Sequence, residues 1–198
     1  MRQSIACSEA LARIEAWAHA RRLDFRHDSR TGFGALFSPC GTWRYLLWRM
    51  HHPRGRVLGM GMLNPSTADE HANDPTIARC HDLARRLGYP GLLVWNLFAL
   101  RATDPAELRK AADPVGPDND AAIGLALILS RETIVAWGNH GALLGRNAHV
   151  LTRCLDTGVT IRVLGVTGQG HPRHPLYLRR DVRPQRWFPA TSPAPSSR

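Results

Sequence analysis

Residues 57–69 read Val-Leu-Gly-Met-Gly-Met-Leu-Asn-Pro-Ser-Thr-Ala-Asp, an apolar run that ends abruptly in a polar loop. The run is typical of a buried strand. It must stop at Asn64-Pro65, because proline has no N–H to donate to a sheet ladder. Ligands of open α/β sheets bind beyond the carboxyl ends of the strands, so Asn64 is a candidate to face a substrate. Taken alone, Asn-Pro is also a common turn signal.

The chain that follows alternates between strand-like and helix-like segments. Strands are predicted at 56–63, 91–98, 132–137 and 160–166, and helices at about 74–88, 105–111, 118–130 and 141–155. Asn73 or Asp74 is expected to cap the first of these helices, with Pro75 in its first turn. The alternation predicts an α/β fold, a three-layer α-β-α domain around a central, mainly parallel four-stranded sheet with right-handed crossovers.

The amino-terminal part has a different pattern. Apolar spacing predicts a helix over 8–22 with Ser8 as its N-cap, and turn residues at 39–41 predict a β-hairpin of 34–38 with 42–49. Alternation of Trp43, Tyr45 and Leu47 with Arg44 suggests a strand with one face on the core. We expect a single domain over 1–190, and a disordered tail over the Pro/Ser-rich residues 191–198.

The charge balance indicates a nucleic-acid partner. The 198 residues include 26 Lys+Arg against 16 Asp+Glu, a net charge of +10, and Lys110 is the only lysine. Arginine binds phosphates through its forked guanidinium, so DNA is the expected partner. A high-GC genome would explain arginine in place of lysine, but it would not explain the net charge.

Hydropathy and cysteine spacing argue against a membrane protein, a secreted protein and a metal site. No apolar run reaches the ~18 residues of a membrane span, and the first residues lack the apolar core of a signal peptide. The four cysteines (Cys7, Cys40, Cys80 and Cys154) are widely spaced and form no CxxC pair. This pattern predicts a reduced, cytoplasmic protein without a metal site. We also expect a monomer that needs no cofactor.

Three strand ends carry polar residues that can converge. Asn64 ends the first predicted strand, Asn96 lies in the second, and residues 168–178 (Gly-Gln-Gly-His-Pro-Arg-His-Pro-Leu-Tyr-Leu) follow the fourth. Parallel strands end on one edge, so these groups should line one cleft. A buried Asn96 must pair its amide with backbone or with a ligand.

The order of these motifs resembles the uracil-DNA glycosylase superfamily. That superfamily has a strand ending in Gly-Gln-Asp-Pro-Tyr or Gly-x-Asn-Pro-Gly, a strand ending in Leu-Leu-Asn before Leu-Thr-Val-Arg, a Trp-Gly strand end, and a His-Pro-Ser-Pro-Leu loop. Here the matching stretches are 62–66, 94–101, 136–141 and 174–176, within residues 58–178. The chain also resembles a bacterial family of unknown function with the motifs LNPSTAD, NLFALRATDP and HPLYL.

The resemblance implies a uracil-DNA-glycosylase-like fold and a catalytic pair. Asn64 would position the water that attacks the sugar, and His174 would donate a hydrogen bond to the departing base. Asn96 would bind the edge of the flipped-out base. His171 is the alternative histidine, but Leu176 follows His174 at the spacing of the superfamily.

Two departures from the superfamily indicate an enlarged base. Ser66 stands where the uracil enzymes have a tyrosine that blocks the pyrimidine 5-position, and Ile77 stands near the place of a stacking phenylalanine. Asp69 and His71 would contact a polar group on the base, or they would only form a solvated loop. The expected substrate is a 5-substituted pyrimidine, including the hypermodified bases of phages.

We therefore expect a DNA glycosylase that leaves an abasic site, in base excision or in anti-phage defence. The DNA-binding candidates are four arginines and an apolar wedge: Arg101, Arg173, Arg179, Arg180, Leu176 and Tyr177. Two alternatives stay open. One is a hydrolase of free nucleosides or nucleotides, and the other is a non-catalytic nucleic-acid-binding protein.

Overall fold

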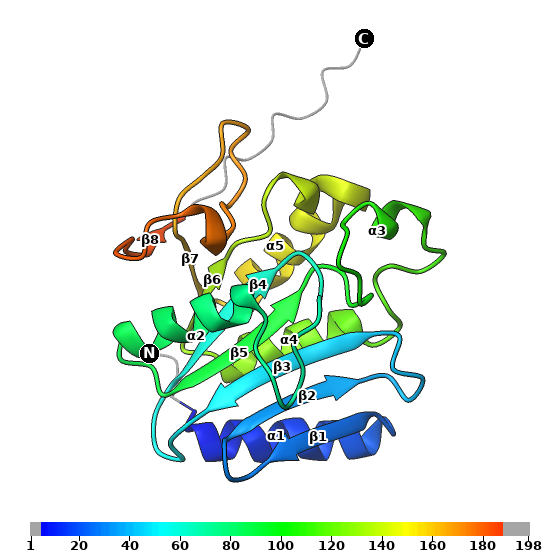
Figure 1. Cartoon of the computed structure of the whole chain (residues 1–198), viewed down its shortest axis with the longest axis vertical. Coiled ribbons are helices and arrows are strands. Elements are labelled where there is room, and N and C mark those ends of the chain that lie inside the picture. Colours follow the sequence, from blue (N-terminus) through cyan, green and yellow to red (C-terminus); the bar gives the residue numbers. More distant parts are fainter. Residues whose placement is uncertain (1–4, 188–198) are drawn as a thin grey trace.

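One mixed sheet of eight strands organises residues 5–187, which are the residues that this computed structural model describes (Figure 1). Its strand order is β1-β2-β3-β5-β4-β6-β7-β8. The strands are β1 (Asp24–Asp28), β2 (Phe33–Phe37), β3 (Arg44–Met50), β4 (Val57–Met62), β5 (Gly91–Asn96), β6 (Glu132–Val135), β7 (Thr160–Val163) and β8 (Gln185–Arg186). The central strands β5, β4, β6 and β7 run parallel, and every other neighbouring pair is antiparallel.

The parallel centre confirms the strand assignments made from the sequence, but the predicted sheet of four strands was too small. The hairpin β2–β3 was predicted as an addition to the sheet, yet β3 pairs with β5 and continues it. Strand β1 was missed because its residues (Asp-Phe-Arg-His-Asp) are mostly polar, as is common at a sheet edge. Strand β8 has only two residues, which is too short to leave a pattern. The predicted tail, 191–198, lies outside the described residues.

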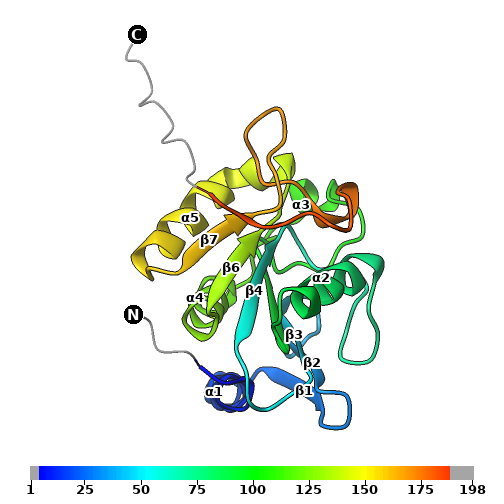
Figure 2. The same ribbon diagram turned by 90° about the vertical axis from the view of Figure 1, so that its left-hand side faces the viewer.

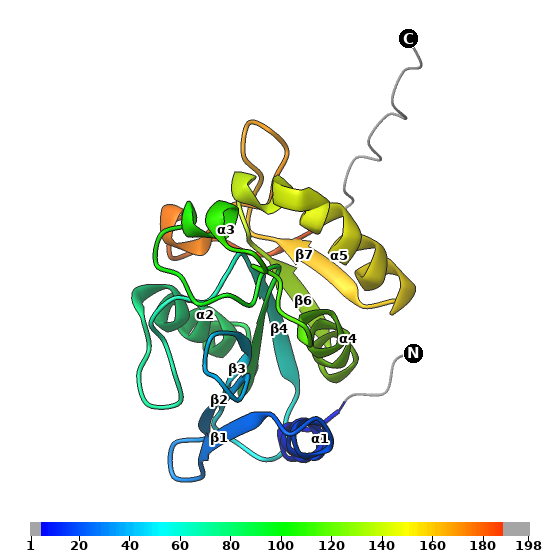
Figure 3. The ribbon, with the colours of Figure 1, turned by 90° about the vertical axis from the view of Figure 1, so that its right-hand side faces the viewer.

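Helices cover both faces of the sheet. Helices α1 (Cys7–Ala20), α4 (Asn119–Leu129) and α5 (Arg146–Asp156) pack on one face, and α2 (Pro75–Arg86) packs on the other (Figures 2 and 3). The remaining helical segments are α3 (Glu107–Lys110) and the 3-10 turns η1 (Asn139–Gly145) and η2 (Pro175–Tyr177). Within residues 5–187, no helix combines the length and the hydropathy needed to cross a bilayer.

The helix starts show one correct and one wrong prediction. Asp74 caps α2, because its carboxylate accepts the Ile77 N–H at 2.8 Å, and Pro75 occupies the first helical position. Ser8 is not the cap of α1, which begins at Cys7 without a side-chain cap. Its first free N–H groups donate instead to the backbone carbonyls of residues 55 and 53, at 2.9 and 3.1 Å. These contacts satisfy donors that a capping side chain would otherwise serve.

The helix predicted over 141–155 is two segments. The 3-10 turn η1 ends where Leu143 is extended (ψ 130°) and Leu144 is left-handed (φ 53°), and α5 begins only after this break. Hydrophobic spacing continues through both segments, so the sequence pattern does not reveal the break. Leu144 is left 68% exposed.

The connections that follow neighbouring central strands leave the sheet toward opposite faces, which creates a crevice next to β4. The connection after β4 runs to α2 on one face, whereas those after its neighbours β5 and β6 run to α4 and α5 on the other face. Connections that leave adjacent strands toward opposite faces separate at the carboxyl ends, where α/β proteins bind ligands. The glycines of β4 suit this crowded centre, since a Cβ on Gly61 would lie 2.4 Å from the Trp95 ring.

Two stacked histidines at the edge of this fold make its stability depend on pH. His51 and His81 stack at 4.4 Å, and burial together with the charges of His51, Arg49 and Arg85 lowers the pKa of His81 from 6.5 to about 4. His81 therefore binds a proton more readily in the unfolded chain than in the folded protein. The free energy of unfolding should fall as the pH drops from 6.5 toward about 4. Urea unfolding at several pH values should show a weaker fall in His81→Gln. An unchanged pH dependence would contradict this assignment. His149→Gln, on exposed α5 surface, is the control.

Candidate active site

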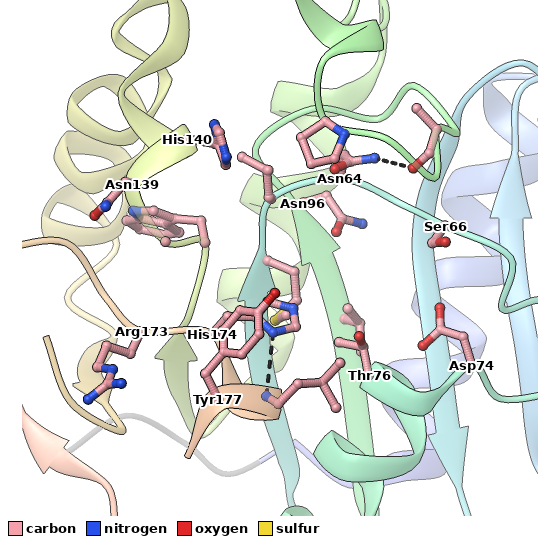
Figure 4. Close-up of a pocket in the computed structure, with 18 of the residues that line it drawn as sticks. Asn64, Ser66, Asp74, Thr76, Asn96, Asn139, His140, Arg173, His174 and Tyr177 are labelled. Atoms are coloured by element: carbon pink, nitrogen blue, oxygen red, sulfur yellow. Dashed lines mark hydrogen bonds between the residues drawn. The ribbon is translucent and has the colours of Figure 1, made fainter. Parts of the chain in front are cut away.

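A cavity of about 790 Å³ opens at the carboxyl ends of β4, β5 and β6 (Figure 4). This volume lies within the range of about 300–1,000 Å³ that is usual for small-molecule sites. Eight of the residues predicted from the sequence line it: Asn64, Ser66, Ile77, Asn96, Arg173, His174, Leu176 and Tyr177. Segments separated by more than a hundred positions in the chain therefore meet here, as the parallel strand ends led us to expect.

Asn64 presents a hydrogen-bond acceptor to the cavity. Its Nδ2 donates to the backbone oxygens of Pro65 at 3.0 Å and Ala102 at 2.7 Å. Both donor hydrogens are thus engaged, which fixes the orientation of the carboxamide and leaves Oδ1 as an acceptor. Such an oxygen can orient a water molecule by accepting one of its hydrogens. It cannot remove a proton as a carboxylate would.

Asn96 presents an unpaired donor to the cavity. The residue is 1% exposed, and its Nδ2 is buried without a hydrogen-bond partner among the described residues. Its backbone is fixed by Asn119, whose Nδ2 donates to the carbonyl oxygens of Asn96 at 3.0 Å and Leu97 at 3.1 Å. A buried amide that lacks a partner is costly, so a ligand acceptor is the natural complement of this group.

His174 presents a neutral imidazole. Burial lowers its pKa below the ordinary value of 6.5, although the charge of Asp74 opposes the shift. Its Nδ1 accepts the backbone N–H of Leu176 at 3.4 Å, so the neutral ring carries its proton on Nε2. The segment that carries His174 is attached to α2 by Arg79, whose Nη2 donates to the backbone oxygen of Leu178 at 3.0 Å. His174 can therefore donate a hydrogen bond without first taking up a charge.

The end of the cavity lined by Arg44, Ser66, Asp74 and Thr76, called the inner end below, contains a buried arginine that sequence analysis missed. Arg44 is 2% exposed, and burial lowers its pKa to about 10, so it remains a cation at neutral pH. Its Nη1 donates to the carbonyl oxygen of Ala68, while its Nε is buried without a partner. The polar side chains of Ser66, Asp74 and Thr76 line the same cavity, and Figure 4 shows these three together on one side of it.

Arg44 was missed because its strand was interpreted as having one buried face. All seven residues of β3 are buried, since the sheet is covered on both sides. Alternation of aromatic and basic residues therefore gave the wrong exposure for Arg44. A signal was nevertheless present in the sequence, because a lone arginine between apolar neighbours in a predicted strand must find either a partner or a ligand.

The opposite end of the cavity is rimmed by exposed residues. Asn139, His140 and Arg173 are exposed there, and Asn139 Oδ1 accepts a hydrogen bond from Thr167 at 2.7 Å. Leu176 is 44% exposed and Tyr177 76% exposed on η2. Two exposed apolar side chains therefore lie at the rim of this end of the cavity.

Two predicted substrate contacts do not reach the cavity. The Asp69 carboxylate turns back on its own loop, where it accepts the N–H groups of His71 and Ala72, both at 2.8 Å. The His71 side chain is 75% exposed. Neither side chain lines the cavity, so the structure does not bring Asp69 and His71 together with the other predicted site residues. An aspartate two or three residues before free N–H groups satisfies them locally.

Several predicted DNA contacts also lie away from the cavity. Arg101 packs over the Phe37 ring at 5.2 Å, Arg179 pairs with Asp181 at 3.2 Å, and Arg180 is exposed. The alternative histidine, His171, does not line the cavity, and its backbone pairs with that of residue 167. Of the two histidines, His174 is therefore the one at the site.

A second buried arginine holds the loop that carries Asn64. Arg49 is 0% exposed, and its Nη2 donates to the carbonyl oxygens of Asp69 at 2.7 Å and Ala72 at 3.1 Å. Its Nε donates to Asn73 Oδ1 at 2.8 Å. Arg44 and Arg49 thus attach residues 68–73 to β3. An irregular loop gains the order that a site needs from such contacts.

Comparison with known proteins assigns a family and leaves its activity open. Residues 44–176 match the family described as "Protein of unknown function (DUF1643)". Neither a curated protein nor a solved structure matches the chain.

Proposed function

The chain belongs to the DUF1643 family, and we propose that it is a DNA glycosylase that hydrolyses the N-glycosidic bond of a 5-substituted pyrimidine. The observation that carries the proposal is one cavity with three complementary groups. These are the acceptor of Asn64, the unpaired donor of Asn96 and the neutral donor of His174.

This set of groups suits the cleavage of a bond between a sugar and a base. Water adds to the sugar carbon as the base departs with the bonding electrons, and one proton of the water finally neutralises the base. The Asn64 oxygen orients the water. His174 Nε2–H donates to the base oxygen on which negative charge develops, and a preorganised donor of this kind lowers the barrier. Asn96 holds the edge of the base.

A polymer substrate is favoured over a free nucleoside by the rim of the cavity. Leu176 and Tyr177 are exposed side chains that can replace a base extracted from the stack. Arg173 lies at the same rim, and the chain carries a net charge of +10. A small nucleoside would need neither an apolar wedge nor a field that attracts phosphates.

A substituent on the base is favoured by the room inside the cavity. A planar pyrimidine between Asn96 and His174 does not fill about 790 Å³. The space continues to Ser66, whose small side chain leaves it open. The proposed base is therefore larger than uracil or cytosine, and its extra group lies at the inner end.

The test is direct. Purified protein is incubated with duplexes that carry plain or 5-substituted uracil or cytosine at one position, and abasic sites are cleaved with alkali. We expect strand cleavage for a 5-substituted base. Absence of cleavage on every duplex, together with hydrolysis of free nucleosides, would favour the small-molecule alternative. Tight binding without any hydrolysis would favour the non-catalytic one.

We predict that DNA affinity falls steeply with salt and that Arg173 accounts for part of this fall. Arg173→Ala should reduce the slope of log affinity against log salt by about 1, because one phosphate contact is lost. Titration of a labelled duplex at several salt concentrations measures the slope. Arg30→Ala is the matched control, since that side chain is 90% exposed and lies outside the cavity. A slope that stays the same in Arg173→Ala would place the DNA elsewhere.

A further inference from the structure

We propose that Arg44 and Asp74 together bind a hydroxyl group on the 5-substituent of the base. This inference rests on the proposed function and names the chemistry of the substituent. Both residues line the inner end of the cavity, away from the exposed rim that carries Asn139, His140 and Arg173. A group bound there lies away from the rim at which the DNA is proposed to bind.

The first observation is an unsatisfied cation. Arg44 is 2% exposed, its Nε has no partner among the described residues, and no direct ion pair joins it to a carboxylate there. Buried charges are normally paired or bound to a ligand, because leaving them alone is expensive. The guanidinium therefore has hydrogen-bonding capacity that the protein itself does not use.

The second observation is a carboxylate with one oxygen to spare. Asp74 Oδ1 accepts the Ile77 N–H as the cap of α2, which leaves Oδ2 for another donor. Figure 4 shows the carboxylate on the same side of the cavity as Ser66 and Thr76. Among the charges around Arg44, that of Asp74 acts most strongly to raise its pKa, and the two side chains line the same cavity without forming an ion pair. The cavity that both residues line can receive a ligand group.

A hydroxyl is the group that this pair fits. It accepts a hydrogen bond from the Arg44 guanidinium and donates one to the Asp74 carboxylate, so both partners are satisfied at once. A methyl group would satisfy neither partner. A carboxylate would suit Arg44 but would bring a second negative charge toward Asp74, which is unfavourable. The hydroxyls of Ser66 and Thr76 add further polar contacts at the same end.

The experiment compares three substituents at one position of a duplex. Single-turnover release is measured for the 5-hydroxymethyl, 5-methyl and 5-carboxyl derivatives of cytosine and of uracil. Wild type should release a hydroxymethyl base at least about tenfold faster than the other two, in line with a hydrogen bond to a charged group. Asp74→Asn keeps an N-cap residue, because asparagine caps helices as well as aspartate does. It should lower the hydroxymethyl-to-methyl ratio about tenfold.

Two further variants keep the outcome interpretable. Asp82→Asn, on the exposed side of α2 and outside the cavity, is the matched control and should leave the ratio unchanged. Ser66→Tyr should fill the inner end and remove release of the substituted bases first. Equal release of the three substituents, or fastest release of the carboxyl base, would overturn the inference while the glycosylase proposal stands. No release of any base would overturn both.

Discussion

Replacing His174 by alanine is expected to slow base release at least about 100-fold. The imidazole is held neutral by burial and keeps its proton on Nε2, where it can stabilise the charge that forms on the departing base. Loss of one preorganised donor of this kind costs about 3 kcal/mol of barrier. Single-turnover kinetics on the preferred duplex, with enzyme in excess, measures the chemical step directly.

Asn64→Ala should have an effect of similar size for a different reason. Its oxygen orients the attacking water, and its amide also joins Pro65 to Ala102. A melting curve must therefore accompany the rate, so that loss of the loop is distinguished from loss of the water contact. His149→Ala, in an exposed ion pair on α5, is the control that should stay active. Full activity of both His174→Ala and Asn64→Ala would refute the glycosylase proposal. Inactivity of His171→Ala with an active His174→Ala would only exchange the two histidines.

Arg49→Met is expected to lower the free energy of unfolding by about 3 kcal/mol. The substitution keeps much of the volume but removes donors to three backbone carbonyls and to Asn73. Buried acceptors that lose their partners cost about 1–3 kcal/mol each, and solvent reaches part of this loop, so the effect falls short of the sum. Loss of the contact between the guanidinium and the Phe33 ring, at 4.2 Å, adds to the cost.

Urea denaturation measures this effect and separates it from a general loss of charge. Arg86→Met is the matched control, since Arg86 forms only an exposed pair with Asp82 four residues away on α2. Such pairs contribute about 0.3–0.5 kcal/mol. Comparable destabilisation in the two variants would mean that the Arg49 contacts do not hold the loop. A large difference would identify Arg49 as a support of the Asn64 loop.

The parallel centre of the fold could be predicted because its signals are local. Strands β4 and β5 are short apolar runs, and the cap of α2 is visible as Asp74 followed by Pro75. The position of the hairpin could not be predicted, because pairing of β3 with β5 joins segments that are distant in the chain. The prediction of the α1 cap failed for the same reason, since backbone carbonyl oxygens of a distant loop accept the hydrogen bonds that a local capping side chain would otherwise accept.

The site was predictable where function depends on strand ends, and it was not where it depends on packing. Asn64 and His174 follow predicted strands and Asn96 lies near the end of one, so topology alone places them together. Arg44 and Arg49 lie inside a strand, and their burial arises from layers on both faces that no local pattern describes. The direction of the Asp69 side chain was not predictable either, because its carboxylate accepts the N–H groups of His71 and Ala72 within its own loop and needs no ligand to do so.

The arrangement of the cavity also has a consequence for how the protein comes into being. Asn64 and Asn96 are synthesised before His174, which follows 110 positions after Asn64 and lies beyond the last central strand, β7. Any segment that contains Asn64, Asn96 and His174 must therefore extend at least from residue 64 to residue 174. Contacts between such distant segments form late, because they require closure of long loops. A growing chain therefore lacks a complete site until His174 has been synthesised, and a chain interrupted before that residue never acquires one.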